Sequence, residues 1–356
     1  MSRKMFYDNN KDEMENQKYP EISIIIPCRN EEEFIGRCLE SLVSNGYPSE
    51  RMEVLVVDGS SEDNTRNIVE EYMRKFEYIR LLENPDKITP KALNIGVRNA
   101  NGEIIFIVSA HAEISFGYLV KCVEYLSQGN ADNVGGILLV KPRINSLISE
   151  AIALTFSHPF GSGNAYYKTG TPMIPKDVDT VPFGCYRRDV FERIGLFNEK
   201  LKRSQDIEFN TRLRKAGGRI LLVPDIYSIY YVRSDLPSYF KHNFQDGLWA
   251  IYPYIFVDSA LRVRHFIPAV FVGSLVSSAI LGVFWRPFRY VIAAITIAYT
   301  VSAGIFSMQI ARKNENAKLL PLCVLAFATR HFGYGLGSMF AIPKTLIYRI
   351  FKYRQS

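Results

Sequence analysis

The segment Arg203–Asn210 opens an expected helix that runs to Gly217-Gly218, and it places Asp206 where that helix should begin. The exposed N–H groups and the dipole of a helix N-terminus favour an ionised carboxylate at this position. An ionised carboxylate that faces a cleft can accept a proton as a general base. The alternative is that Asp206 only caps the helix, which is the usual role of Asp there.

The chain has 356 residues, of which 47% are hydrophobic, and a net charge of +7, enough for one α/β domain and a further region. Residues 1–20 are polar and contain no apolar core of the kind that a signal peptide needs. We expect them to form a disordered tail on the cytoplasmic side. The five cysteines are scattered without a Cys-x-x-Cys pair, so neither a zinc site nor a disulfide framework is predicted.

Residues 265–356 have the composition of a membrane region. Two almost uncharged runs, about 266–285 and 288–310, have the length needed to cross the hydrocarbon core of a bilayer. A third apolar segment, 319–342, carries Arg330-His331 at its middle, and charge at the midplane is expensive. We therefore expect this segment to re-enter the membrane or lie in its interface, which gives two spans, with three as the alternative.

Loop charges agree with two spans. If the N-terminal domain is inside the cell, the basic residues of 312–318 and of the tail also lie inside. The sequence thus predicts a multi-pass protein of the cell membrane with a cytoplasmic catalytic domain at 21–235. Residues 236–264 are expected to link that domain to the membrane. The positive charge is assigned to anionic lipid, and no nucleic-acid partner is expected.

Strands and helices alternate in the first half of the chain. Strands are expected at 22–26, 53–57, 79–82 and 103–108, separated by helical stretches, which predicts βαβ units and a parallel sheet. In such a sheet, ligands bind beyond the carboxyl ends of the strands. Polar clusters follow three of these strands, at 27–31, 58–64 and 109–113. One cleft could therefore collect them.

Two helix starts carry recognisable signals. Asn30 with Glu33 resembles a capping box that starts a helix through Leu42, and Thr89-Pro90 reads as an N-cap followed by proline. No Gly-x-Gly-x-x-Gly follows the first strand, and no phosphate-binding lysine loop is present. This disfavours dinucleotide-binding, P-loop and nucleotidyltransferase functions.

The order of the motifs resembles that of the family 2 glycosyltransferases, and within that family the membrane-attached succinoglycan-biosynthesis type. The segments that carry the resemblance are Ile26–Glu32, Val56–Thr65, Lys91–Gly96 and Gln205-Asp206, with Thr180–Phe191 and Phe244–Trp249 for the narrower match. The resemblance implies a GT-A-like (Rossmann-like), mostly parallel mixed sheet with helices on both faces, followed by C-terminal transmembrane helices.

The resemblance also implies an activity. It is the inverting transfer of a sugar from a nucleotide-sugar donor to a lipid-linked or saccharide acceptor at the cytoplasmic membrane face, for exopolysaccharide or surface glycan synthesis. Asp206 matches the position of the family's catalytic base. The alternative is a catalytically silent nucleotide-binding partner of other glycosyltransferases, which the loss of an acidic residue at Ser109 would explain.

The resemblance further assigns the donor-binding residues. Asp58, at the end of a strand, could accept hydrogen bonds from uracil or ribose, although Asp before Gly59-Ser60 could also serve only to form a turn. Lys91 could reach the nucleotide from its helix or be merely solvated. The full expected donor-binding set is Pro27, Arg29, Glu31, Asp58, Lys91, Ser109 and Ala110.

The metal site departs from the family pattern. The family places Asp-x-Asp or Asp-Ala-His after the fourth strand, and this chain has Ser109-Ala110-His111. Mg²⁺ and Mn²⁺ prefer carboxylate oxygen, although Mn²⁺ also accepts imidazole. His111 with Glu113 could hold a divalent metal, Mg²⁺ or Mn²⁺, or His111 could simply be packed in the cleft. The sequence leaves metal dependence open.

The segment Gln245–Trp249 resembles a degenerate Gln-x-x-Arg-Trp motif of processive family members. Leu248 replaces the arginine that would contact diphosphate, so processivity is not inferred. Gln205, Gln245 and Trp249 are expected on the acceptor or diphosphate side. Trp249 could instead be an aromatic anchor at the membrane interface.

Overall fold

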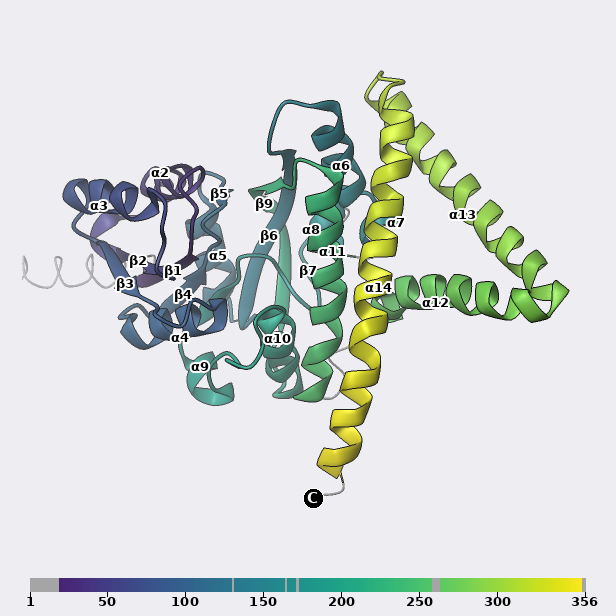
Figure 1. Ribbon diagram of the computed structural model, residues 1–356. Helices are drawn as coiled ribbons and strands as arrows, with labels where there is room; N and C mark the ends of the chain where they lie inside the picture. Colours follow the sequence, from purple (N-terminus) through teal and green to yellow (C-terminus); the bar gives the residue numbers. More distant parts are fainter. Residues whose placement is uncertain (1–18, 130, 164, 171–172, 258–262, 354–356) are drawn as a thin grey trace, which may run out of the picture. The chain divides into compact units, whose positions relative to one another are not determined.

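The structure is a computed structural model that describes residues 19–353, apart from 130, 164, 171–172 and 258–262. The chain forms two compact units, which are described separately (Figure 1). The sheet unit comprises Met1–Leu138, Gly170–Lys202 and Arg212–Tyr230. The helical unit comprises Leu139–Thr169, Arg203–Thr211 and Tyr231–Ser356.

The described strands form one mixed sheet, in the order β3-β2-β1-β4-β8-β6-β9-β5, with β7 paired to β9. The first four strands are parallel to one another, whereas β8 is antiparallel to both β4 and β6. This confirms the predicted mixed sheet, in which the first four strands are parallel and the printed pairings of β5, β7 and β8 are antiparallel. The strands are β1 (Ile22–Cys28), β2 (Met52–Asp58), β3 (Ile79–Glu83), β4 (Ile104–Ile107), β5 (Ala112–Ile114), β6 (Asn133–Pro142), β7 (Lys176–Asp177), β8 (Cys185–Arg187) and β9 (Ile220–Val232).

Helices cover both faces of the sheet, as side chains of β1 show. Ile24 and Ile26 belong to the same buried cluster as Ile35 of α2. Ile25 points to the other face, where a Cβ on Gly96 of α4 would lie 2.3 Å from its Cγ2 atom. The helices of this unit are η1 (Ser49–Arg51), α2 (Ile35–Val43), α3 (Thr65–Lys75), α4 (Thr89–Asn99), α5 (Tyr118–Ser127) and α9 (Asp189–Ile194).

The predicted capping box is wrong. Helix α2 begins at Ile35, four residues later than expected, and no side chain caps it. Asn30 adopts a left-handed backbone with φ 54°. Its side-chain oxygen accepts a hydrogen bond from the Glu62 N–H at 2.9 Å, so it serves the neighbouring loop. Helix α4 starts at Thr89 with Ile88 as N-cap, one residue before the predicted cap, and Pro90 lies in its first turn as expected.

The helical unit contains three helices that are long and apolar enough to cross a membrane. These stretches are His265–Phe284, Arg286–Lys313 and Leu319–Tyr348. Helix α14 runs unbroken through the segment 319–342, and the number of spans stays a prediction. The described helices are α6 (Leu147–Ser157), α7 (Pro159–Ser162), α8 (Tyr166–Thr169), α10 (Gln205–Lys215, ending in the sheet unit), α11 (Leu236–Ile251), η2 (Tyr252–Ile255), α12 (Val263–Phe284), α13 (Arg286–Lys313) and α14 (Leu319–Tyr353).

Helices α11 and α14 lie side by side at very short range (Figure 1). Gly333 and Gly337 of α14 are one turn apart and both face α11. A Cβ on Gly337 would lie 2.0 Å from the Phe244 carbonyl oxygen, and one on Gly247 would lie 2.0 Å from that of Tyr334. Small residues at this spacing let two helix backbones approach closely. The glycines therefore set the contact between the two helices.

We predict that Gly337→Ala destabilises the helical unit by about 1–3 kcal/mol, because the added methyl group overpacks a backbone contact. The matched control is Gly304→Ala in α13, where no atom lies within 4 Å of the added carbon. That control should be neutral or raise stability by about 0.5–1 kcal/mol through helix propensity. Thermal unfolding of both purified variants in one detergent measures the difference, and equal midpoints would contradict the close packing.

Candidate functional site

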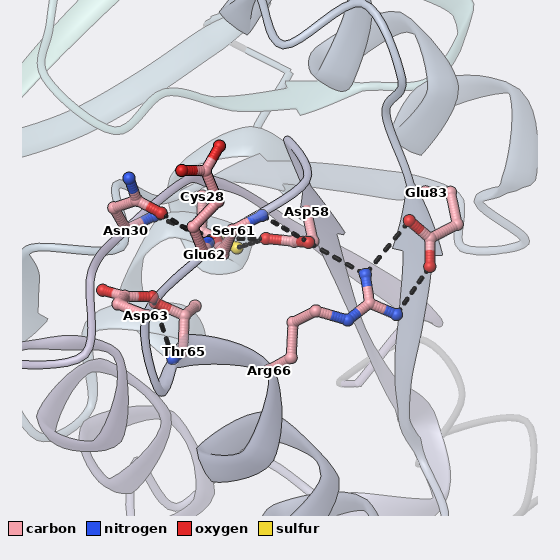
Figure 2. A network of polar contacts seen from close by, with 9 residues as sticks. All are labelled: Cys28, Asn30, Asp58, Ser61, Glu62, Asp63, Thr65, Arg66 and Glu83. Carbon is pink, nitrogen blue, oxygen red and sulfur yellow. Dashed lines mark hydrogen bonds and ion pairs between the residues drawn. The ribbon is translucent and has the colours of Figure 1, made fainter.

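Asp58 ends strand β2 beside Cys28 of β1, and its carboxylate is fully buried. Its Oδ1 atom accepts the Ser61 hydroxyl at 2.5 Å and lies 3.8 Å from the Cys28 sulfur (Figure 2). Its Oδ2 atom accepts the Ser61 N–H at 3.1 Å and the Arg66 Nη1 at 2.9 Å. Protein donors thus engage both oxygens, and Asp58 closes the turn that follows β2.

Arg66 links this turn to strand β3. Its Nη2 and Nη1 atoms contact the two Glu83 carboxylate oxygens at 2.6 and 3.0 Å. Those hydrogen bonds, with that to Asp58, raise the pKa of the Arg66 guanidinium. Arg66 therefore holds together the carboxyl ends of two neighbouring strands.

The loops after β1 and β2 are hydrogen-bonded to each other. The Asn30 N–H donates to the Ser61 hydroxyl at 2.9 Å, and the Glu31 N–H donates to that of Thr65 at 2.8 Å. Asp63 accepts the Thr65 hydroxyl at 2.5 Å. Limited burial tends to raise the Asp63 pKa, but these and other hydrogen bonds lower it. The loop that carries Arg29 and Glu31 is thus fixed by its neighbour.

His111 contacts two of the expected donor-binding residues. Its Nδ1 atom lies 3.0 Å from a Glu31 carboxylate oxygen, and the Ser109 hydroxyl is 3.2 Å from its Nε2 atom. The ring also stands edge-on to Tyr230, with centroids 5.5 Å apart. The sequence suggested Glu113 as a companion of His111, which stays a prediction, and did not suggest the contact with Glu31. The signal available in the sequence was that both residues follow neighbouring parallel strands.

Few side chains at this site could serve as metal ligands. Among the described residues, no group of three or more His, Cys, Asp or Glu side chains could hold an ion. Glu31 and His111 supply one carboxylate and one imidazole within 3.0 Å of each other. Mg²⁺ and Mn²⁺ are often held by one or two protein ligands together with substrate phosphates. These two residues fit a shared site of that kind and not an all-protein one.

The other expected donor-binding residues differ in burial and in their contacts. Pro27 is half-buried within β1, and Ala110 is buried, leaving its backbone as the polar group. Arg29 is accessible, with a weak ion pair to Glu62 at 3.8 Å. Lys91 forms an ion pair with Asp86 at 2.8 Å, and its role toward the nucleotide stays a prediction.

Asp206 lies in the first turn of α10, as predicted. Its surface is accessible to solvent, yet the surrounding protein disfavours the charged form and raises its pKa. The backbone N–H groups at the helix start and the Lys168 charge lower that pKa, whereas the charge of Asp246 raises it. An accessible carboxylate with a raised pKa suits a general base. That catalytic role stays a prediction.

The expected acceptor-side residues share the helical unit. On α11, the Trp249 indole N–H donates to the Gln245 side-chain oxygen at 3.2 Å. The Gln205 side-chain oxygen is buried and has no hydrogen-bond partner among the described residues. Sequence reasoning missed His242 and Asp246, which are one turn apart on α11, with His242 Nε2 3.3 Å from Asp246 Oδ2. The i, i+4 spacing was the available signal.

The mixed sheet, with polar residues at its carboxyl edge, defines a GT-A-like α/β fold. The family model "Glycosyl transferase family 2" matches residues 23–195. This chain belongs to that family and is a glycosyltransferase.

Two relatives have informative names. A Methanococcus voltae protein is 33% identical over 64% of this chain and 71% of its own length. It is the dolichyl N-acetyl-alpha-D-glucosaminyl phosphate 3-beta-D-2,3-diacetamido-2,3-dideoxy-beta-D-glucuronosyltransferase. Succinoglycan biosynthesis protein ExoA of Rhizobium meliloti is 27% identical over 63% of this chain and 67% of its own length.

A solved structure shares the fold. It is the mannosyltransferase PcManGT of Pyrobaculum calidifontis in complex with GDP-Man and Mn²⁺. The match has a TM-score of 0.58 and 20% identity, and it covers 92% of this chain and 87% of the other.

We predict that Arg66→Met opens the turn around Asp58, because the buried carboxylate loses its cation. The expected cost is about 1–3 kcal/mol, since an unpaired buried charge is strongly unfavourable but Arg66 itself is partly exposed. Alkylation of Cys28 in the native protein, followed by peptide mapping, reports the opening locally. The control Arg80→Met removes an exposed arginine of β3 and should leave Cys28 protected, and equal labelling of both variants would refute the prediction.

Proposed function

We propose that the chain transfers a sugar, with inversion at the anomeric carbon, from a nucleotide-sugar to a lipid-linked or saccharide acceptor at the cytoplasmic membrane face. The product would be an exopolysaccharide or another surface glycan. One observation carries the proposal: Asp206 belongs to the same compact unit as the three helices of membrane-spanning length. A base on that unit can receive an acceptor presented from the bilayer.

The relatives support the choice of acceptor and product. The Methanococcus voltae enzyme is named for a dolichyl-linked sugar phosphate, and ExoA for succinoglycan synthesis. The Pyrobaculum protein was solved with a nucleotide-sugar. Together they favour a nucleotide-sugar donor and a lipid-linked acceptor for this chain.

In the proposed reaction, Asp206 takes the proton of the acceptor hydroxyl while that oxygen attacks the anomeric carbon. The bond from this carbon to the diphosphate breaks, and the nucleoside diphosphate leaves with the electron pair. The donor would bind at the carboxyl edge of the sheet, near Arg29, Glu31, Ser109 and His111. Glu31 and His111 would hold a divalent ion, which would offset charge on the leaving group.

The membrane arrangement that we propose has α12 and α13 as spans and α14 in the interface. Helix α11 packs along α14 and carries the exposed Lys241 as well as Asp246. If α14 crossed the bilayer, these charges would be carried toward hydrocarbon at a high cost. The domain boundaries of the proposal stay at 21–235, 236–264 and 265–356.

We predict that a C-terminal reporter active only inside the cell is active in this protein. Two spans return the chain to the side of its N-terminal domain. A fusion within the turn between α12 and α13 serves as the control and should be inactive. Activity of the same reporter at the turn but not at the C-terminus would indicate the opposite orientation with two crossings, and inactivity at both would indicate three spans.

We predict that Asp206→Asn lowers kcat by about 10²–10⁴-fold, the usual contribution of a general base, while donor binding is kept. The measurement is sugar transfer by purified protein with a panel of nucleotide-sugars and polyprenyl-linked acceptors. Asp225→Asn, an exposed carboxylate of the sheet unit, is the control and should retain activity. Full activity of Asp206→Asn would refute the base assignment.

The silent-partner alternative makes a different prediction for the wild-type protein. It expects nucleotide-sugar binding without turnover in the presence of any divalent metal. Turnover by the wild-type chain with any donor and acceptor pair excludes it.

A further inference from the structure

Three side chains of the helical unit form a polar cluster. One of them, Arg203, lies two residues before the start of α10, and the other two lie on α11. Arg203 Nη1 lies 3.3 Å from Asp246 Oδ1, and Arg203 Nη2 lies 3.4 Å from His242 Nδ1. His242 Nε2 lies 3.3 Å from Asp246 Oδ2. Each member therefore contacts both of the others.

The protonation state of His242 fits this arrangement. The His242 pKa is lowered to about 4, chiefly by burial, with Asp246 opposing the shift and the charges of Arg203, Arg233 and Arg330 adding to it. The imidazole is thus neutral near pH 7 and has one N–H. With that proton on Nε2, His242 donates to Asp246 and accepts from Arg203 through Nδ1. The cluster then has one cation, one anion and a neutral bridge.

Helix α11, which carries two members of the cluster, is itself anchored. Arg330 of α14 donates to the Asn243 side-chain oxygen at 2.9 Å and also to the carbonyl of Gly161. Asn243 directly follows His242 and is fully buried. The close contact of Gly247 with α14 lies one residue beyond Asp246. The carboxylate of Asp246 therefore projects from a rigid support.

The segment between the cluster and the base adopts a costly backbone. Ser204, which joins Arg203 to the start of α10, has a φ of 58°, in the left-handed region that non-glycine residues rarely occupy. Such a conformation persists only where the surroundings impose it. Arg203, held on α11, is the neighbouring residue that can impose it.

We propose that Asp246 is a positioning residue for catalysis, which holds Arg203 and thereby fixes the direction in which the Asp206 helix begins. The proposal rests on the proposed function of Asp206 as the base. It assigns His242 the role of keeping the Asp246 carboxylate in the rotamer that reaches Arg203. Neither residue touches the reacting atoms.

The same geometry sets the charges around the base. Lys168 of α8 and Asp246 of α11 act on Asp206 in opposite directions, the cation lowering and the anion raising its pKa. Arg203 forms an ion pair with Asp246, with its Nη1 3.3 Å from Asp246 Oδ1. Removing the Asp246 charge should therefore lower the Asp206 pKa, both directly and by releasing the Arg203 cation. Removing the Lys168 charge should raise it.

The test is the pH profile of kcat/KM for wild type, Asp246→Asn and Lys168→Met. Because transfer needs Asp206 ionised, the acid limb reports its pKa in the free enzyme. We expect the limb to move to lower pH in Asp246→Asn and to higher pH in Lys168→Met. We also expect kcat of Asp246→Asn to fall by up to about 10²-fold, as misplacement of a reacting group does. An unmoved acid limb in Asp246→Asn would overturn the proposal.

The matched control lies on the same helix. Asp235 caps α11 by accepting the Ser238 N–H at 2.8 Å, so Asp235→Ala weakens the helix without altering the cluster. If it reproduces both effects of Asp246→Asn, the role of Asp246 is only structural and the proposal fails. If wild type transfers no sugar, or Asp206→Asn is fully active, the proposed function fails instead. The positioning role alone would be refuted by one combination of results. In it, wild type is active, Asp206→Asn is inactive, and Asp246→Asn has the kcat and pH profile of wild type.

Discussion

The parallel pairing of β1 with β2 on one side and β4 on the other is the constraint on which the proposed donor-binding edge of the sheet depends. It sets Cys28 opposite Asp58, so the loops that follow β1 and β2 start at one edge. Those loops then bond to each other, through pairs such as Asn30 with Ser61. The consecutive apolar residues Ile24 and Ile25 are both fully buried on opposite faces, as expected for a strand covered by helices on both sides.

Much of this arrangement could be predicted from the sequence, because strand periodicity and motif order are local or nearly local signals. The four parallel strands β1 to β4 and the position of Asp206 at a helix start follow from them, whereas strands β5 to β9 were not predicted. The capping prediction for Asn30 failed because its side-chain oxygen accepts the Glu62 N–H from another loop, a partner that the local pattern does not reveal. The contact of His111 with Glu31 spans 80 positions, and no local pattern encodes it.

Arg330 illustrates a second kind of limit. From the sequence, a guanidinium inside an apolar segment is only a cost. In the structure it stacks on the Phe156 ring at 4.7 Å and donates to Asn243, so its hydrogen-bonding capacity is used within the protein. Whether a buried charge is tolerated depends on hydrogen-bonding and ring partners from other segments. Amino-acid composition alone does not identify those partners.

The division of the chain has a consequence for how the protein holds together. Its two units are built from six alternating segments, so the polypeptide passes between them five times. The helical unit is therefore no appended anchor: the carbonyl of Gly161, far upstream, is a hydrogen-bond partner of Arg330 in the last helix. Removing Tyr231–Ser356 would leave Leu139–Thr169 and Arg203–Thr211 without the rest of the helical unit to which they belong. The helices of membrane-spanning length therefore share one compact unit with segments that lie far upstream of them in the chain.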